Sequence, residues 1–169
     1  MALRLAACGL VAGACGTLAM DLVWYGRYKR GGGESSFVGW ESTAGLSSWD
    51  DASAPAKVGK LVYETATHTE LPPSAARLTT NVMHWSYGVQ WGVLFAFSVG
   101  AVWRMRARQA PLLGLLVWLA SYVILPVAGV YKPIWSYDLK ALWQDLSAHL
   151  VYGSAVGGAF AVIGRALPE

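Results

Sequence analysis

The chain has 169 residues, of which 55% are hydrophobic and only 14% are charged, and its mean hydropathy is +0.40. An average soluble domain carries about 25% charged residues, so this composition and its long apolar runs favour a membrane protein over a soluble domain. The net charge is +3, but the basic residues form no tract with interleaved aromatic residues, which argues against nucleic acid as a partner.

The first apolar run, residues 3–25, predicts a membrane span. A signal peptide is the alternative, because Arg4 precedes the run and the residues ending at Cys8 resemble a lipoprotein cleavage box. However, no apolar region precedes that box, and the run extends well beyond signal length, so we expect an uncleaved span. Cys8 and Cys15 would lie roughly 10 Å apart along one helix, which is too far for a disulfide bond.

Residues 26–78 are more polar and predict an extramembrane segment. Three of its aromatic residues, Phe37, Trp40 and Trp49, are expected at the level of the lipid headgroups. A short amphipathic helix is predicted next, capped by Asp51 or Ser53, with Pro55 in its first turn and the segment ended by Pro72 and Pro73. We expect it to lie on the membrane or on the bundle through one face, made of Val58, Leu61, Val62 and Thr65. His68, near its end, is expected to be solvated.

Three further spans are predicted, at about residues 80–103, 111–131 and 142–165. The third loosens at Pro126 and Gly129, and the last helix is expected to begin near Ser136 and to project beyond the lipid. The prediction for residues 1–169 is therefore a single all-α membrane domain. Its architecture would be an integral-membrane four-helix bundle built from two tandem helical hairpins.

The short connection between the second and third spans carries three arginines, Arg104, Arg106 and Arg108. Basic residues in short loops favour the cytoplasmic side. Both termini are then predicted to be cytoplasmic, in a multi-pass protein of the bacterial plasma (inner) membrane. Arg27, Lys29 and Arg30 flank the opposite side and weigh against this orientation.

One pattern occurs twice: HWSYGVQWGVLF begins at His84 and HLVYGSAVGGAF begins at His149, and both fit H-x-x-Y-G-x-x-x-G-x-x-F. The two copies lie on the second and fourth spans, which run in the same direction, and this indicates tandem hairpins. Small residues also recur every four positions, which predicts close helix packing. The glycines of these rows are Gly9, Gly13, Gly88, Gly92, Gly153 and Gly157.

The rows end in polar residues, and alternating helix directions place these ends on one side of the membrane. The predicted polar cluster consists of Asp21, Asn81, His84, Asp145 and His149. Asp145 and His149 are four residues apart on one helix and can touch. Ionisable residues in spans are functional hypotheses by default. The alternative is a hydrogen-bonded polar cap that only fixes the helix register.

Three stretches are distinctive in their order: GWESTAGLSSWDDASAPAKVGK, NVMHWSYGVQWG and YKPIWSYDLKALWQDLSAHLVYG. Together they resemble uncharacterised small membrane proteins of actinobacteria, which are distantly similar to the YagU-like bacterial inner-membrane family. The resemblance implies an integral plasma-membrane protein with several spans. YagU-like proteins are loosely associated with acid stress, and the resemblance supplies no catalytic residues.

Patterns typical of helix packing outnumber patterns typical of catalysis or ligand binding in this sequence. The predicted function is therefore that of an accessory or structural subunit. Its predicted partners are the lipid bilayer and either a second copy of itself or a larger membrane complex. The first alternative is a small transporter or proton-handling protein that uses the Asp and His side chains. The second is a protein that binds b-type haem, or a metal ion, through His84 and His149. No cofactor is predicted in the first case. Phosphate-loop, serine-hydrolase and H-E-x-x-H motifs are missing from the sequence, so no enzyme activity is expected.

Overall fold

The structure is a computed structural model that describes residues 2–101 and 109–166. These residues form helices and no strand, which confirms the all-α prediction for the described part of the chain. Four helices are long: α1 (Ala2–Arg30), α4 (Ala76–Ala101), α5 (Ala110–Val127) and α6 (Leu139–Ala166). Two are shorter, α2 (Phe37–Glu41) and α3 (Ala54–Thr67), and single 3-10 turns lie at Pro73–Ala75 and Ile134–Ser136.

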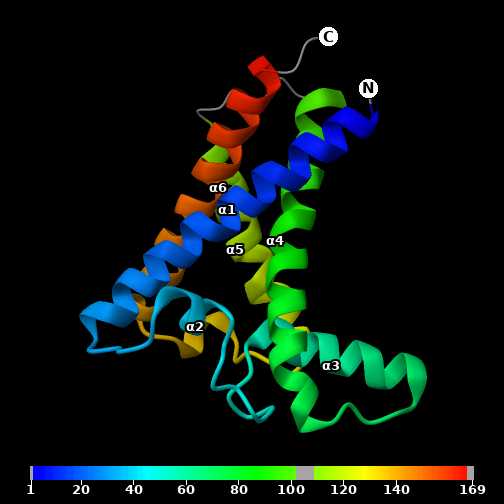
Figure 1. Cartoon of the computed structure of the whole chain (residues 1–169), viewed down its shortest axis with the longest axis vertical. Coiled ribbons are helices and arrows are strands. Elements are labelled where there is room, and N and C mark those ends of the chain that lie inside the picture. Colours follow the sequence, from blue (N-terminus) through cyan, green and yellow to red (C-terminus); the bar gives the residue numbers. More distant parts are fainter. Residues whose placement is uncertain (1, 102–108, 167–169) are drawn as a thin grey trace.

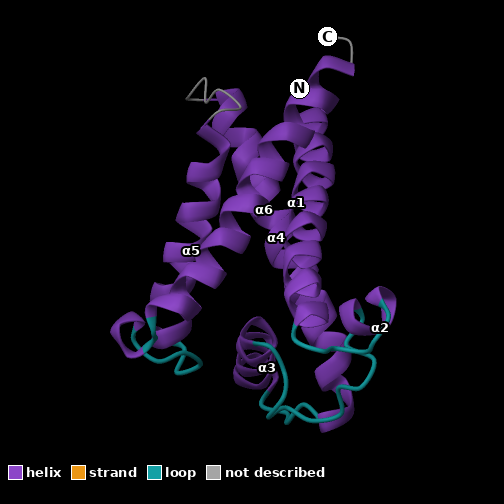
Figure 2. Ribbon diagram, turned by 90° about the vertical axis from the view of Figure 1, so that its left-hand side faces the viewer, coloured by secondary structure: helices purple, strands orange, loops and turns teal. Residues whose placement is uncertain are grey.

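The long helices pack in the spatial order α4, α1, α6, α5. α1 contacts both α4 and α6, and α5 packs mainly against α6. α3 contacts both α4 and α5. It lies across the lower end of the molecule, below the gap between these helices (Figure 2). The start of α1 and the end of α6 lie together at one end of the molecule, whereas α2 and α3 lie at the other end (Figure 1).

Among the described residues, three helices are long and apolar enough to cross a membrane: Ala2–Arg30, Ala110–Val127 and Leu139–Gly164. They correspond to the first, third and fourth predicted spans. The predicted second span lies on α4, which is not among them. Its first half carries polar side chains, including His84, Ser86 and Gln90, and these lower its hydropathy. The last two residues predicted for this span, and the loop with Arg104, Arg106 and Arg108, lie outside the described residues.

Helix ends differ from the predicted ones where local hydrogen bonds decide them. α1 continues to Arg30 and stops at glycines, of which Gly32 has φ +90°. α5 ends at Val127, earlier than predicted, because Gly129 (φ +71°) turns the chain and the N–H of Val130 donates to the Leu125 carbonyl at 2.9 Å. The prediction that the last helix begins near Ser136 was wrong. That residue ends a 3-10 turn, and α6 begins at Leu139, where the Asp138 carboxylate accepts the Ala141 N–H at 2.7 Å.

The segment that follows α1 folds back on this helix through its aromatic residues. Phe37 meets Tyr25 edge to face at 5.2 Å between ring centroids, and Trp40 lies 5.5 Å from the same ring. This contact holds α2, which the sequence did not predict, against the end of α1. Phe37 and Trp40, expected among the headgroups, therefore pack partly on protein.

The amphipathic helix of the first loop is present as α3, with a different buried face from the one predicted. Ala56 is fully buried, and a Cβ added at Gly59 would lie 2.7 Å from Met83 Cγ on α4. Leu61 and Val62 are 46% and 61% exposed, so this part of the predicted apolar face points away from the bundle. The small residues pack on α4 because they let the helices approach closely. His68, at the end of α3, is exposed as predicted.

Glycines lie where the long helices touch. A Cβ at Gly9 would lie 2.6 Å from Val93 Cα, and one at Gly13 would lie 2.8 Å from Val89 Cα. Gly92 lies against the backbone of Gly9 and Gly13, so the glycine rows of α1 and α4 face each other. The same closeness occurs between α5 and α6, where Gly153 lies against Ala110 and Gly114. Gly157, one turn further along α6, is also buried. Between these contacts lies an apolar core, built mainly from Ala12, Phe95, Leu113, Val117, Tyr152 and Val156.

Candidate functional site

A histidine–aspartate contact joins α1 to α4 near the end of the molecule that carries α2. The Asp21 side chain, on a residue only 3% exposed, accepts the ring N–H of His84 at 2.9 Å (Oδ1) and 3.0 Å (Oδ2). A buried carboxylate is costly unless it is paired and hydrogen-bonded. His84 therefore satisfies both oxygens of Asp21. The first copy of the repeated motif, which begins at His84, thus contributes a contact between two helices.

Glu41, the last residue of α2, brings a second carboxylate to this pair. Its ligand atom, one from Asp21 and one from His84 all lie within 4.8 Å of one another. The indole N–H of Trp85 donates to Glu41 Oε1 at 3.0 Å and holds the carboxylate in place. Burial raises the pKa of the Glu41 carboxyl and the nearby Asp21 carboxylate adds to the rise, whereas His84 and the Trp85 hydrogen bond oppose it.

Beside Glu41 and His84 lies a cavity of about 150 Å³, which is also lined by Ser53, Thr80 and Asn81. The Ser53 and Thr80 hydroxyl oxygens are buried and have no hydrogen-bond partner among the described residues. Ser53 was predicted to cap α3. It occupies the N-cap position, but its side chain makes no cap hydrogen bond. Two unpaired hydroxyls beside a carboxylate and an imidazole make this cavity suited to a polar occupant.

Asn81 lines the same cavity but does not bond to the predicted histidines and aspartates. Its side-chain N–H groups donate to the Ser42 carbonyl (3.2 Å), to Thr43 Oγ1 (3.1 Å) and to the Arg77 carbonyl (2.8 Å). Arg77 also donates to the Ser42 carbonyl, at 2.9 Å. Asn81 therefore fixes the chain that follows α2, and it positions Glu41 indirectly.

The second copy of the motif forms a local pair on α6. The Nδ1 atom of His149 lies 2.9 Å from the Asp145 carbonyl oxygen and 3.3 Å from its Oδ1. Asp145 also interacts with the Tyr122 phenol of α5, beside a group of rings that includes Tyr131 and Tyr137. The five predicted polar residues thus divide into an Asp21–His84 pair, an Asp145–His149 pair and Asn81 by itself.

The two histidines face a common cavity of about 30 Å³, which Tyr87, Gly88 and Tyr152 help to line. This is room for about one water molecule, so the cavity cannot hold a haem between His84 and His149. The Tyr152 hydroxyl closes it by donating to the Gly88 carbonyl. The haem hypothesis is therefore at odds with the size of this cavity.

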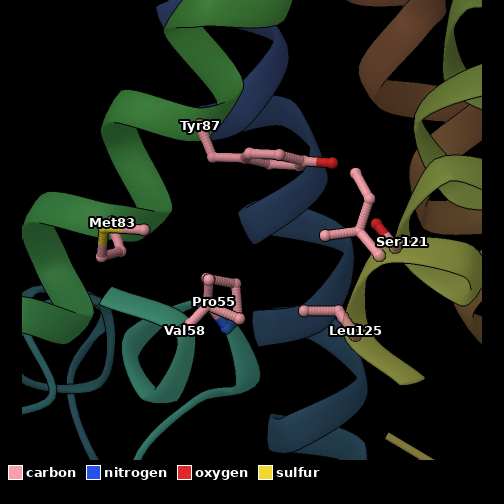
Figure 3. A pocket seen from close by; sticks show the side chains of 7 residues that line it. Pro55, Val58, Met83, Tyr87, Ser121 and Leu125 are labelled. Atoms are coloured by element: carbon pink, nitrogen blue, oxygen red, sulfur yellow. The ribbon is translucent and has the colours of Figure 1, made fainter. Parts of the chain in front are cut away.

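A separate apolar cavity of about 60 Å³ lies where α3, α4 and α5 meet. Met83 and Tyr87 reach it from α4, Pro55 and Val58 from α3, and Leu125 from α5 (Figure 3). Its lining offers few polar groups, so it adds no chemistry to the polar site.

Glu41, Thr80 and Ser53 were not predicted as site residues. Glu41 follows Trp40 in a segment without helical or strand periodicity, so its depth could not be read from the sequence. The available signal was an acidic residue among closely spaced aromatic residues, in FVGWE. Comparison of the chain with protein families, with characterised proteins and with solved structures found no match. The resemblance to YagU-like proteins therefore stays a prediction.

Proposed function

We propose that this chain is a non-enzymatic accessory protein of the bacterial plasma membrane, in which four helices cross the bilayer as two tandem hairpins. The glycine contacts between α1 and α4 carry this proposal, because added Cβ atoms at Gly9 and Gly13 would meet backbone. In lipid, such small-residue faces drive helix association by van der Waals packing. The residues at the polar end would then hold the 31–75 segment as a cap on the membrane surface.

The outward faces of the candidate spans support a lipid environment. Large apolar side chains are exposed along them, among them Leu10, Leu18, Leu116, Val123 and Val162. A soluble domain buries most of its large apolar side chains in one core. Large contiguous exposed apolar patches are rare on soluble monomers. A bilayer, or another membrane subunit, would cover these faces.

A proton-handling role is the alternative, and the arrangement of polar groups argues against a continuous path. The polar region narrows from the cavity at Glu41 to the small cavity between His84 and His149. Beyond Tyr152 the described core consists of apolar residues such as Phe95, Leu113 and Val156. This arrangement supports a structural or binding site over a proton path.

Topology tests the membrane arrangement. In a chain lacking Cys8 and Cys15, single cysteines at Thr69 and Lys132 would be labelled with an impermeant maleimide in intact cells and in inverted vesicles. If α4 crosses the membrane, the two positions lie on the same side and Ala2→Cys lies on the opposite side. If α4 does not cross, Thr69 and Lys132 lie on opposite sides, and the four-span proposal fails.

Reconstitution tests the accessory role. Liposomes containing the purified protein should show no proton flux above that of empty liposomes under a pH gradient. In mild detergent the protein should migrate as a constant oligomer or complex. A flux that His84→Ala and His149→Ala abolish would replace the accessory role with proton transport, and a strictly monomeric chain would also contradict it.

A further inference from the structure

We infer that Asp21, Glu41 and His84 form a binding site for a divalent transition-metal ion of the Zn²⁺ type, with the cavity beside Thr80 as its open side. The three residues come from α1, α2 and α4, and their ligand atoms lie within 4.8 Å of one another. One imidazole and two carboxylates are a ligand set that Zn²⁺ accepts, and sites with three protein ligands keep a fourth position for water or another ligand.

The site sets two carboxyl groups against one imidazole. Asp21 and Glu41 each offer carboxyl oxygens, and His84 offers at most one positive charge in return. The nearest arginine on α4, Arg77, donates to the Ser42 carbonyl and hydroxyl instead of to either carboxylate. A divalent ion would neutralise both carboxylates in a largely buried place, where unpaired charge is expensive.

The hydrogen bonds orient the ligand atoms toward one point. Trp85 donates to Glu41 Oε1 and orients the side chain as outer-shell partners do around metals, and Glu41 also interacts with the Asp21 carboxyl, which an ion between them would bridge. The His84 Nε2 atom and the Asp21 carboxylate are 2.9 Å apart. Two ligands of one Zn²⁺ are roughly 3.4 Å apart at bond lengths of about 2.1 Å. The ion would therefore take the place of the shared proton after a small separation of the side chains.

An independent observation points to a further occupant. Thr80 is only 6% exposed, its hydroxyl has no hydrogen-bond partner within the described part of the chain, and it lines the cavity that Glu41 and His84 also line. The Ser53 hydroxyl lines the same cavity and likewise has no hydrogen-bond partner among residues 2–101 and 109–166. A metal-bound water in the open position could satisfy both oxygens, and the cavity of about 150 Å³ has room for it.

The protein itself supplies a matched control. Asp145 and His149 repeat the aspartate–histidine pairing, at 3.3 Å, but no third acidic, cysteine or histidine ligand joins them among the described residues. If a histidine–aspartate pair were enough, both copies would bind metal equally. If the third ligand matters, only the copy next to Glu41 will bind.

The test uses the full-length protein in detergent, stripped with EDTA and titrated with ZnCl₂ by calorimetry, with metal content measured after desalting. We expect one Zn²⁺ per chain and, with Co²⁺ as a probe, visible absorption bands that Zn²⁺ removes. His84→Gln and Glu41→Gln should each weaken binding by more than the roughly 10–100-fold typical of an outer-shell change, whereas His149→Gln should leave it unchanged. Glu41→Gln preserves the shape of the side chain and an acceptor for Trp85, so it tests the ligand without unfolding the site.

Failure to bind Zn²⁺ after stripping, or binding that survives both His84→Gln and Glu41→Gln, would overturn the inference. Loss of binding in His149→Gln alone would overturn it as well, because the ion would then lie on α6. The site depends only on the local meeting of α1, α2 and α4. A negative result would therefore leave the proposed accessory role and its topology untouched.

Discussion

Alanine at Gly13 tests whether the close approach of α1 and α4 holds the bundle together. The added Cβ would lie 2.8 Å from Val89 Cα and 2.9 Å from the Gly88 carbonyl oxygen, and both are backbone atoms that no rotamer change can move. Gly26→Ala is the matched control on the same helix, since a Cβ there meets nothing within 4 Å. Both substitutions add the same methyl group to α1, so any gain in helix propensity cancels between them.

The difference between the two variants is then the cost of overpacking, which is about 1–3 kcal/mol in well-packed interiors. We expect Gly13→Ala to unfold at a lower SDS fraction in mixed micelles than Gly26→Ala, with a free energy of unfolding lower by that amount. Tryptophan fluorescence and circular dichroism would follow the transition. Equal stability of the two variants would refute the view that the glycine rows set the spacing of these helices.

Three further variants test single contacts. His84→Ala removes the histidine partner of the buried Asp21 carboxylate. The free energy of unfolding, measured in the same micelles, should fall by about 3–5 kcal/mol. A loss below about 1 kcal/mol would mean that water satisfies the carboxylate. Arg27→Lys keeps the charge but cannot reproduce the two hydrogen bonds that one guanidinium donates to α6, at 2.6 and 2.8 Å. The free energy of unfolding should therefore fall by about 1.5–3 kcal/mol. An unchanged free energy of unfolding would show that these bonds are dispensable. The N–H of Leu71 donates to Glu64 at 2.8 Å and lowers the pKa of that carboxyl below its usual 4.5, so this contact contributes stability above pH 4.5 that is lost as the pH falls through the lower folded-state pKa. The Leu71 amide shift should follow that titration in the native chain and be flat in Glu64→Gln, and a titration that persists in the variant would assign it to another group.

Hydropathy and spacing were enough to predict most of the helices, because a stretch that must satisfy its backbone in an apolar environment has little choice but a helix. The Asp145–His149 contact was predictable for a similar reason: residues four apart on a helix are neighbours whatever surrounds them. The ends of α5 and α6 were predicted less well. They depend on individual hydrogen bonds near Gly129 and Asp138. Neighbouring residues in the sequence could end or begin these helices equally well.

The candidate site is a product of the tertiary structure. Alternating helix directions placed Asp21 and His84 at the same end, but their contact requires α1 and α4 to meet in one register, which the facing glycines select. Glu41 joins them only because aromatic side chains fold α2 back onto α1. The spacing of residues in an irregular segment does not predict that the segment folds back onto a distant helix. The sequence by itself determined an all-helical chain with apolar helices and the local Asp145–His149 pair. Long-range packing decided that Asp21 meets His84, and that this pair acquires a second carboxylate and a cavity, because those contacts join residues with no local relation in the chain.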